Sequence, residues 1–206
     1  MAIESTIDDL ARASGQDVLA FRLKHLNDPR AMDVVQTAAS RFGWASRFEG
    51  PAGAGRGFAF ARYKNLEAWC AVAVEVAVEP DTGRLHVKRM VAAVDTGQVV
   101  NPDGIRNQVE GGMLQALNWA LFEQVTFDRT RVTSIGWSAY PILRFGDVPG
   151  SIDVHIIERP GDGFFGVAEA AQGPSGAALA DARDATGLRL RELPFTASKI
   201  KSAIGL

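Results

Sequence analysis

A run of alternating valines constrains the fold of this chain more than any other feature. Residues 68–78 read Ala-Trp-Cys-Ala-Val-Ala-Val-Glu-Val-Ala-Val, with a valine at every second position from Val72 onward. Such alternation of β-branched side chains is typical of a strand. Residues 80–83 then have the turn composition Pro-Asp-Thr-Gly, and residues 85–94 form a second apolar run. The pattern predicts a hairpin, and with it an antiparallel sheet, because these residue types favour tight turns.

Weaker patterns extend this sheet and add helices to it. Residues 58–63 and 152–158 alternate like strands, and residues 125–127 with 131–137 predict a second hairpin around Asp128-Arg129-Thr130. Helical spacing of apolar residues predicts a long helix at 101–122 and a helix of small residues at 174–185.

The first 48 residues have a different character. Apolar residues at helical spacing predict three short helices at 4–14, 17–26 and 30–42, so we expect residues 1–48 to form a helical lead-in. Residues 49–57 are rich in glycine and are predicted to be a linker. Residues 58–206 then form the second unit. The predicted fold class is α+β, with a helical N-terminal lead-in followed by a mainly antiparallel sheet packed against two or more helices.

Charge and composition narrow the classes of partner. The chain has 206 residues and a formal net charge of -2 with no basic run, so we expect neither nucleic acid nor an anionic membrane surface as partner. No apolar run is long enough for a membrane span. The three histidines lie far apart in the sequence, and no metal site is predicted from them. The single cysteine, Cys70, lies in an apolar run and is predicted to belong to the core.

The predicted helix at 101–122 contains two adjacent glycines, Gly111 and Gly112, after Gln108. Each glycine in a helix interior costs roughly 1 kcal/mol relative to alanine. Close approach of a ligand to this face would explain them, and so would tight packing of the helix on the sheet. The sequence alone leaves both explanations open.

A loop rich in glycine, at residues 161–176, holds the candidate for acid–base chemistry. Its carboxylate, Glu169, is followed by Pro174, a residue suited to the first turn of a helix. We therefore expect Glu169 on a loop just before a helix N-terminus, whose free N–H groups attract anions. A carboxylate there is a candidate general base. The alternative is a turn with one exposed glutamate.

Four motifs in a fixed order give this pattern a family resemblance. They are Asp-Thr-Gly-Gln-Val-Val-Asn-Pro-Asp at 95–103, Gln-Val-Glu-Gly-Gly at 108–112, Tyr-Pro-Ile-Leu-Arg at 140–144 and Gly-Val-Ala-Glu at 166–169. Together they resemble the C-terminal part of the molybdenum-binding large subunit of the xanthine dehydrogenase/aldehyde oxidase family. The branch that includes isoquinoline 1-oxidoreductase and nicotinate dehydrogenase is the most similar. The resemblance covers nearly the whole chain but only the last portion of that subunit, so we expect a piece of a longer subunit.

The resemblance implies roles for particular residues. Glu169 matches the family's active-site glutamate, which usually follows Gly-Val-Gly, so Ala168 departs from the pattern. Gln108 matches the glutamine that hydrogen-bonds the pterin. Gly111 and Gly112 would let the pterin approach the helix. The loop against the metal's ligands corresponds to Gly166, Val167 and Ala168.

The resemblance also implies a cofactor and partners. The cofactor is molybdopterin with molybdenum, in its cytosine dinucleotide form. The implied reaction hydroxylates an N-heteroaromatic or aldehyde substrate, with oxygen from water and Glu169 as base. With one cysteine in the chain, iron–sulfur clusters would lie on a small partner subunit. The remainder of the molybdenum subunit is a second expected partner. The sequence leaves the compartment open between cytoplasm and periplasm.

A second hypothesis is that the isolated chain is a truncated domain. Such a domain would fold but hold no molybdenum and have no activity alone. Apolar surface that the rest of the subunit would cover would then favour self-association.

Overall fold

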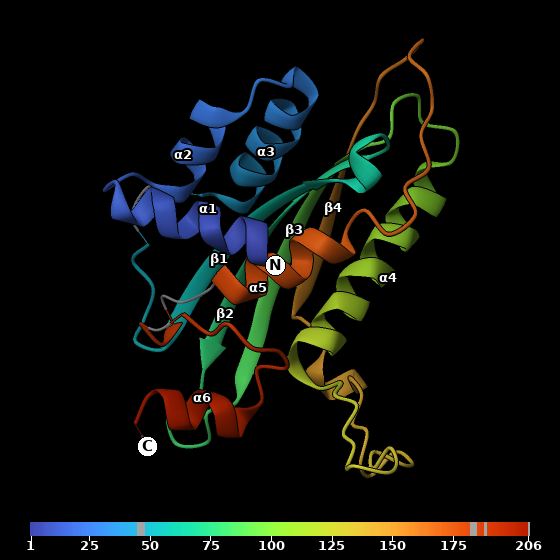
Figure 1. The fold of residues 1–206 in the computed structure, drawn as a ribbon. Helices are drawn as coiled ribbons and strands as arrows, with labels where there is room; N and C mark the ends of the chain where they lie inside the picture. The colour runs from blue at the N-terminus through green and yellow to red at the C-terminus, as the bar shows by residue number, and fades with distance from the viewer. Residues whose placement is uncertain (45–47, 182–184, 188, 206) are drawn as a thin grey trace.

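Four strands form one mixed sheet at the centre of the molecule (Figure 1). The computed structural model describes residues 1–44, 48–181, 185–187 and 189–205. The strands are β1 (Ala54–Arg62), β2 (Trp69–Val78), β3 (Leu85–Asp95) and β4 (Ser151–Ile157), in the order β1-β2-β3-β4. β2 is antiparallel to both β1 and β3, whereas β4 is parallel to β3. A parallel neighbour needs a long crossover connection, which residues 96–150 supply.

The hairpin between β2 and β3 confirms the strongest prediction from the sequence. Its turn closes through a hydrogen bond from the Glu79 N–H to the Arg84 carbonyl oxygen at 2.9 Å. Gly83 has a φ of +73°, and a Cβ atom there would lie 2.4 Å from the Ala197 carbonyl oxygen. Glycine at this position therefore permits both the turn and the close approach of the C-terminal helix.

The predicted linker is wrong over its second half. β1 begins at Ala54, so residues 54–57 are strand rather than linker. Arg56 pairs with Glu75 of β2, and Arg56 and Gly57 are buried. Pairing with β2 outweighs the low intrinsic strand preference of glycine, because strand preference depends strongly on tertiary context.

The three N-terminal helices are present as predicted: α1 (Ala2–Ala13), α2 (Val18–His25) and α3 (Pro29–Phe42). The Asp17 and Asp28 side chains cap α2 and α3 by accepting hydrogen bonds from backbone N–H groups of the first turn. α3 packs on one face of the sheet and shares a core with it. Members of this core include Val34, Val35, Ala38, Phe42, Phe58, Trp69, Ala71, Ala73, Val91 and Ala93. α3 thus covers one face of the sheet.

The other face of the sheet is covered by α4 (Pro102–Leu121) and α5 (Gln172–Asp181). Side chains along β2 alternate between the two sides, and Cys70 and Val72 point toward α4 and α5. Because both faces are covered, β2 is almost continuously apolar. Burial raises the pKa of the Cys70 thiol to about 12, as expected for a core cysteine.

Two boundaries at the C-terminal end differ from prediction. α5 begins two residues before Pro174, and residues 182–184 of the predicted helix lie outside the described residues. A short helix, α6 (Ala197–Ala203), was not predicted, and the Thr196 hydroxyl caps it by accepting from the Lys199 N–H. None of the helices that the structure describes is both long and apolar enough to cross a membrane.

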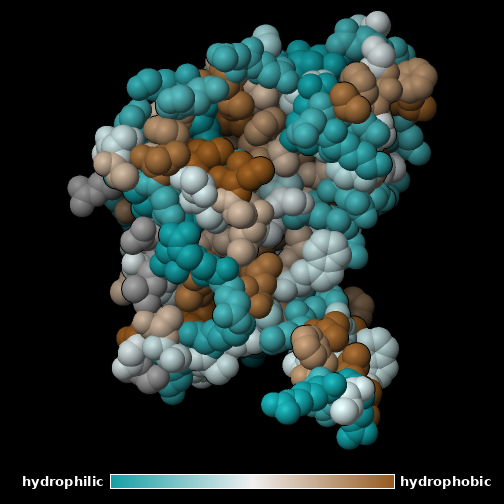
Figure 2. Space-filling model, viewed as in Figure 1, coloured by the Kyte–Doolittle hydropathy of each residue, from teal (hydrophilic) through white to brown (hydrophobic). Residues whose placement is uncertain are grey.

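Residues 123–149 leave α4 and project away from the sheet as an arm before β4 begins (Figure 1). The hairpin predicted there is reduced to one bridge between Phe127 and Val132. The arm is anchored at its base, where the Tyr140 hydroxyl donates to a Glu123 carboxylate oxygen and Leu143 N–H donates to Asn118 Oδ1 at 2.7 Å. Figure 2 shows hydrophobic residues gathered on this projection, so the arm carries apolar surface outside the core.

Candidate functional site

The glycine loop is attached to the end of β3 through backbone contacts. The Phe165 N–H donates to the Thr96 carbonyl oxygen at 2.8 Å, and the Gln98 N–H donates to that of Gly163 at 3.2 Å. Gly97 lies between them with a φ of +74°, and a Cβ atom there would lie 1.8 Å from the Gly163 carbonyl oxygen. Only glycine fits at residue 97, and its presence lets the loop that carries Glu169 lie against the sheet.

A buried carboxylate fixes this end of β3. Asp95 is fully buried and accepts hydrogen bonds from Arg30 Nε at 2.9 Å and Arg159 Nε at 3.0 Å, and from the Gly97 N–H at 2.8 Å. Burial alone would raise the pKa of Asp95, but these donors outweigh it, so its pKa is lowered. Arg159 also pairs with Asp33 of α3. The ion cluster therefore joins α3, β3 and the segment that leads into the glycine loop.

Asp95 was missed as a site-forming residue by sequence reasoning. A charged residue ending a long apolar strand is the signal that could have singled it out, since buried carboxylates need partners. Its arginine partners are 65 and 64 residues away in the chain, and nothing local in the sequence identifies them.

The predicted glutamine and the predicted glutamate loop meet. Gln108, on α4, donates its side-chain amide to the Ala168 carbonyl oxygen at 2.8 Å. Ala168 is the residue immediately before Glu169, and its φ of +35° lies in a region that L residues rarely adopt. In the family pattern a glycine usually stands at this position, and glycine would adopt this conformation at a lower free-energy cost. The substitution of alanine for that glycine therefore coincides with backbone strain at residue 168.

The two glycines of α4 have different surroundings. Gly112 is buried, and a Cβ atom there would lie 3.5 Å from the Ala171 Cβ and 3.6 Å from the Gln172 Cγ. A methyl group at Gly112 would therefore make ordinary van der Waals contact with the start of α5. Gly111 is exposed, with nothing within 4 Å of the corresponding Cβ position. Among the described residues, no close contact requires glycine at either position.

Glu169 lies on the turn before α5, as the sequence predicts. Its carbonyl oxygen accepts from the Gln172 N–H at 3.1 Å, and its side chain is exposed. The Tyr63 hydroxyl donates to Glu169 Oε2 at 3.3 Å. The side chain lines a surface hollow of about 400 Å³, whose other walls come from the end of β1, from Trp119 of α4 and from the first turn of α5. An exposed carboxylate in such a hollow can accept a proton from a bound molecule.

Phe164 and Phe165, beside the glutamate loop, take different positions. Phe164 is exposed, whereas Phe165 is half-buried with its ring 5.7 Å from that of Trp69, edge to face. Neither ring lines the hollow that holds Glu169. Phe165 therefore packs the loop onto the sheet.

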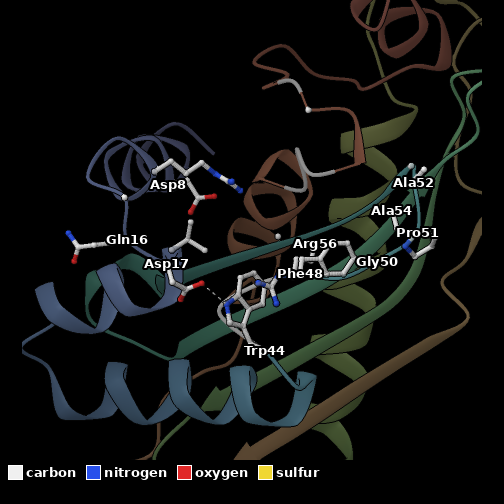
Figure 3. Close-up of a pocket in the computed structure, with 16 residues that line it drawn as sticks. Asp8, Gln16, Asp17, Trp44, Phe48, Gly50, Pro51, Ala52, Ala54 and Arg56 are labelled. Atoms are coloured by element: carbon white, nitrogen blue, oxygen red, sulfur yellow. Dashed lines mark hydrogen bonds between the residues drawn. The ribbon is translucent and has the colours of Figure 1, made fainter.

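A larger hollow, of about 970 Å³, lies elsewhere in the described part of the chain (Figure 3). Its walls come from the α1–α2 junction, from Trp44 and Phe48, and from residues 50–57. Arg56 stacks 3.9 Å from the centre of the Trp44 ring, and the Trp44 indole N–H donates to Asp17. No predicted site residue lines it. Among the predicted site residues, only Glu169 lines the smaller hollow. The candidate site lies there because Gln108 also bonds the residue just before Glu169, and volume by itself indicates no chemistry.

The residues around Glu169 fit a bound pterin cofactor. Gln108, Gly111, Gly166 and Ala168 are all exposed, and Val167 is half-buried. At Gly111 nothing lies within 4 Å of the Cβ position, so a ligand can approach the backbone there, whereas the Glu67 carboxylate lies 3.3 Å from the Cβ position at Gly166. Gln108 supplies a side-chain amide on the same helix as Gly111. Within the described residues there is no group of three or more histidine, cysteine, aspartate or glutamate side chains that could hold a metal ion.

Comparison with known proteins gives relatives over the whole chain. A nicotinate dehydrogenase polypeptide of Pseudomonas putida is 44% identical over 99% of the chain, and the beta chain of isoquinoline 1-oxidoreductase of Brevundimonas diminuta is 38% identical over 94%. The chain spans only 18% and 25% of the lengths of these two proteins.

Solved structures give the same grouping. Quinoline 2-oxidoreductase from Pseudomonas putida 86 matches with a TM-score of 0.60 and 27% identity, over 66% of this chain and 18% of that one. The aldehyde oxidoreductase from Desulfovibrio desulfuricans matches with a TM-score of 0.59 and 28% identity, over 66% and 15%. Residues 4–149 match the family described as the molybdopterin cofactor-binding domain. The chain therefore belongs to the molybdopterin cofactor-binding domain family, within the xanthine dehydrogenase/aldehyde oxidase group of proteins.

Proposed function

We propose that this chain is the part of a molybdenum hydroxylase that supplies the catalytic base and one wall of the cofactor site. The substrate would be an N-heteroaromatic compound or an aldehyde. The names of the relatives support this class, since they include nicotinate, isoquinoline, quinoline and aldehyde enzymes.

One observation carries the proposal: the hydrogen bond from Gln108 to the Ala168 carbonyl oxygen. It joins two motifs that are 60 residues apart in the chain. A glutamine exposed on α4 and a glutamate exposed on the adjoining turn then border one surface. A cofactor bound at that surface would meet both.

The roles follow from where the residues lie. Gln108 and the exposed Gly111 would hold the pterin, in its cytosine dinucleotide form, and the backbone of residues 166–168 would lie against the metal end. When bound, the molybdenum cofactor supplies a two-electron acceptor. Glu169 would take the proton from the attacking oxygen, which comes from water. The two electrons would leave through iron–sulfur clusters on a partner subunit, and the remainder of the molybdenum subunit would close the site.

The test is Glu169→Gln in the complete enzyme. The amide keeps the shape but cannot accept the proton, so we expect turnover to fall by about 10²- to 10⁴-fold or more, with molybdenum content unchanged. The matched control is Glu158→Gln, at an exposed position next to β4, which should leave turnover unchanged. Turnover retained in Glu169→Gln would reject the role of base.

The second candidate function is that the chain alone is an inactive domain. The small share of each relative's length that it spans favours this, as does the apolar surface of the arm. Metal analysis of the purified chain separates the two cases. We expect no molybdenum in the chain by itself, and a stoichiometric amount would reject this candidate.

A further inference from the structure

The segment after β1 has an unusual backbone. Residues 63–65 form a tight turn in which Lys64 and Asn65 have φ values of +49° and +58°. Two consecutive non-glycine residues in this region cost free energy that the surrounding structure must offset. The Tyr63 N–H donates to the Ala68 carbonyl oxygen at 2.8 Å, and the Tyr63 carbonyl oxygen accepts from the Glu67 N–H at 3.0 Å. These bonds close the turn and fix where Tyr63 stands.

The turn presents the Tyr63 side chain to Glu169. The tyrosine ring is half-buried against the core beneath α4 and α5, and its hydroxyl lies 3.3 Å from Glu169 Oε2. Both residues line the same hollow of about 400 Å³. The separation is longer than is usual between two oxygens in a hydrogen bond, but such bonds at active sites often shorten when ligand binds.

We infer that Tyr63 is a positioning residue for Glu169. An exposed glutamate on a turn samples several rotamers, and a donor on a rigid ring selects one of them. With Oε2 held by the hydroxyl, Oε1 is left to accept a proton from the reacting oxygen. The strained turn at residues 64–65 is the structural cost of holding that donor in place. This inference rests on the proposed role of Glu169 as base.

The experiment compares Tyr63→Phe with Tyr140→Phe. These are the two tyrosines of the chain, and each change removes one hydroxyl. Phenylalanine keeps the packing of either ring. The Tyr140 hydroxyl bonds Glu123 at the base of the arm, so Tyr140→Phe is the matched control.

In the complete enzyme, we expect Tyr63→Phe to lower kcat roughly tenfold, about the effect of a lost hydrogen bond to a charged group, with KM unchanged. In the Glu169→Gln background, Tyr63→Phe should cause no further loss. Tyr140→Phe should change neither kcat nor KM.

A second readout uses the chain without cofactor. The carboxyl ¹³C resonance of Glu169, labelled and measured at pH 8, should shift in Tyr63→Phe and stay in place in Tyr140→Phe. An unmoved resonance together with an unchanged kcat in Tyr63→Phe would overturn the inference. If Glu169→Gln is inactive while Tyr63→Phe behaves like the wild type, only the role of Tyr63 is overturned. If Glu169→Gln keeps its turnover, the proposed function itself has failed.

Discussion

At the scale of single residues, the carboxylate of Asp95 holds the site together. It is fully buried, and Arg30 and Arg159 both bond it. Asp95→Asn removes the charge and leaves two guanidinium groups facing each other. We expect the free energy of unfolding to fall by about 3 kcal/mol, as when one partner of a buried ion pair is removed. Urea unfolding of the chain, followed by tryptophan fluorescence, measures this.

The control for that substitution is Asp33→Asn. Asp33 pairs with the same Arg159, but its side chain is 48% exposed. Exposed pairs contribute little, so we expect a loss below about 1 kcal/mol. Equal losses of unfolding free energy in the two variants would show that the stabilisation does not depend on burial of the Asp95 carboxylate.

The same residue predicts an acid response. The pKa of Asp95 is lowered in the folded chain, so its ionised form stabilises the fold fully above its unfolded pKa of about 3.9. That stabilisation is lost as pH falls through the folded pKa, because the carboxylate must then be protonated. Stability measured below about pH 4 should therefore fall more steeply in the wild-type chain than in Asp95→Asn.

What the sequence predicts at this scale depends on how local the signal is. The positions of Glu169 before a helix and of Cys70 in the core follow from neighbouring residues, and the structure confirms both. Asp95 and Tyr63 acquire their roles from partners 64 to 106 residues away. Contacts that depend on tertiary packing leave no periodic pattern, so the partners of these two residues could not be identified from the sequence.

At the scale of secondary-structure elements, α4 carries a glycine that its packing does not explain. A Cβ atom at Gly111 would meet nothing within 4 Å. Because alanine favours helix over glycine, Gly111→Ala should raise the free energy of unfolding by roughly 1 kcal/mol. In the complete enzyme the same change should lower cofactor content, since a methyl group would stand where we propose that the pterin approaches. Thermal unfolding and metal analysis measure the two effects.

A stabilised Gly111→Ala enzyme with full cofactor content would contradict the cofactor role of that glycine. Gly112→Ala serves as comparison, because a Cβ atom there would make ordinary contact with Ala171 and Gln172. It should leave the α4–α5 contact in place, and its methyl group would not reach the exposed face of the helix.

Elements with strong periodicity were predicted well, and those without it were not. β2, β3 and α4 match their predicted bounds to within one residue. The start of β1 was missed because residues 54–57 contain two glycines, whose strand conformation comes from pairing with β2. α6 was missed because its seven residues show too little apolar spacing to identify a helix.

At the scale of the whole molecule, the sequence predicts the layers only in part. The predicted sheet with α4 and α5 on it is correct, but α3 packs on the opposite face rather than standing apart. The parallel pairing of β4 with β3 also could not be predicted. The direction in which two strands pair depends on the path of the connection between them, and the sequence pattern of that long connection does not give its path.

The arm predicts how the isolated chain behaves. Four of its large apolar side chains are at least 71% exposed: Phe127, Ile135, Trp137 and Phe145. Clusters of exposed apolar residues favour association. We therefore expect the purified chain to self-associate at micromolar concentration, and the double variant Phe127→Ser, Trp137→Ser to shift it toward monomer. Light scattering after size exclusion measures the mass.

The control is Leu66→Ser, which removes an equally exposed apolar side chain, at 72% exposure, from the turn after β1. It should leave the association unchanged. If Leu66→Ser disperses the chain as well as the arm variant does, association is a general property of the surface rather than of the arm.

The parallel position of β4 has a consequence for how the chain is made. The antiparallel strands β1, β2 and β3 are close in sequence and can pair early. In contrast, β4 can pair with β3 only after residues 96–150 have been synthesised and folded across the sheet. Until then the outer edge of β3 offers unpaired backbone groups to any other nascent strand. Slow translation of this crossover lengthens the time for which the edge of β3 is exposed. A temperature or expression rate that favours folding of the crossover should therefore increase the share of the product that stays soluble.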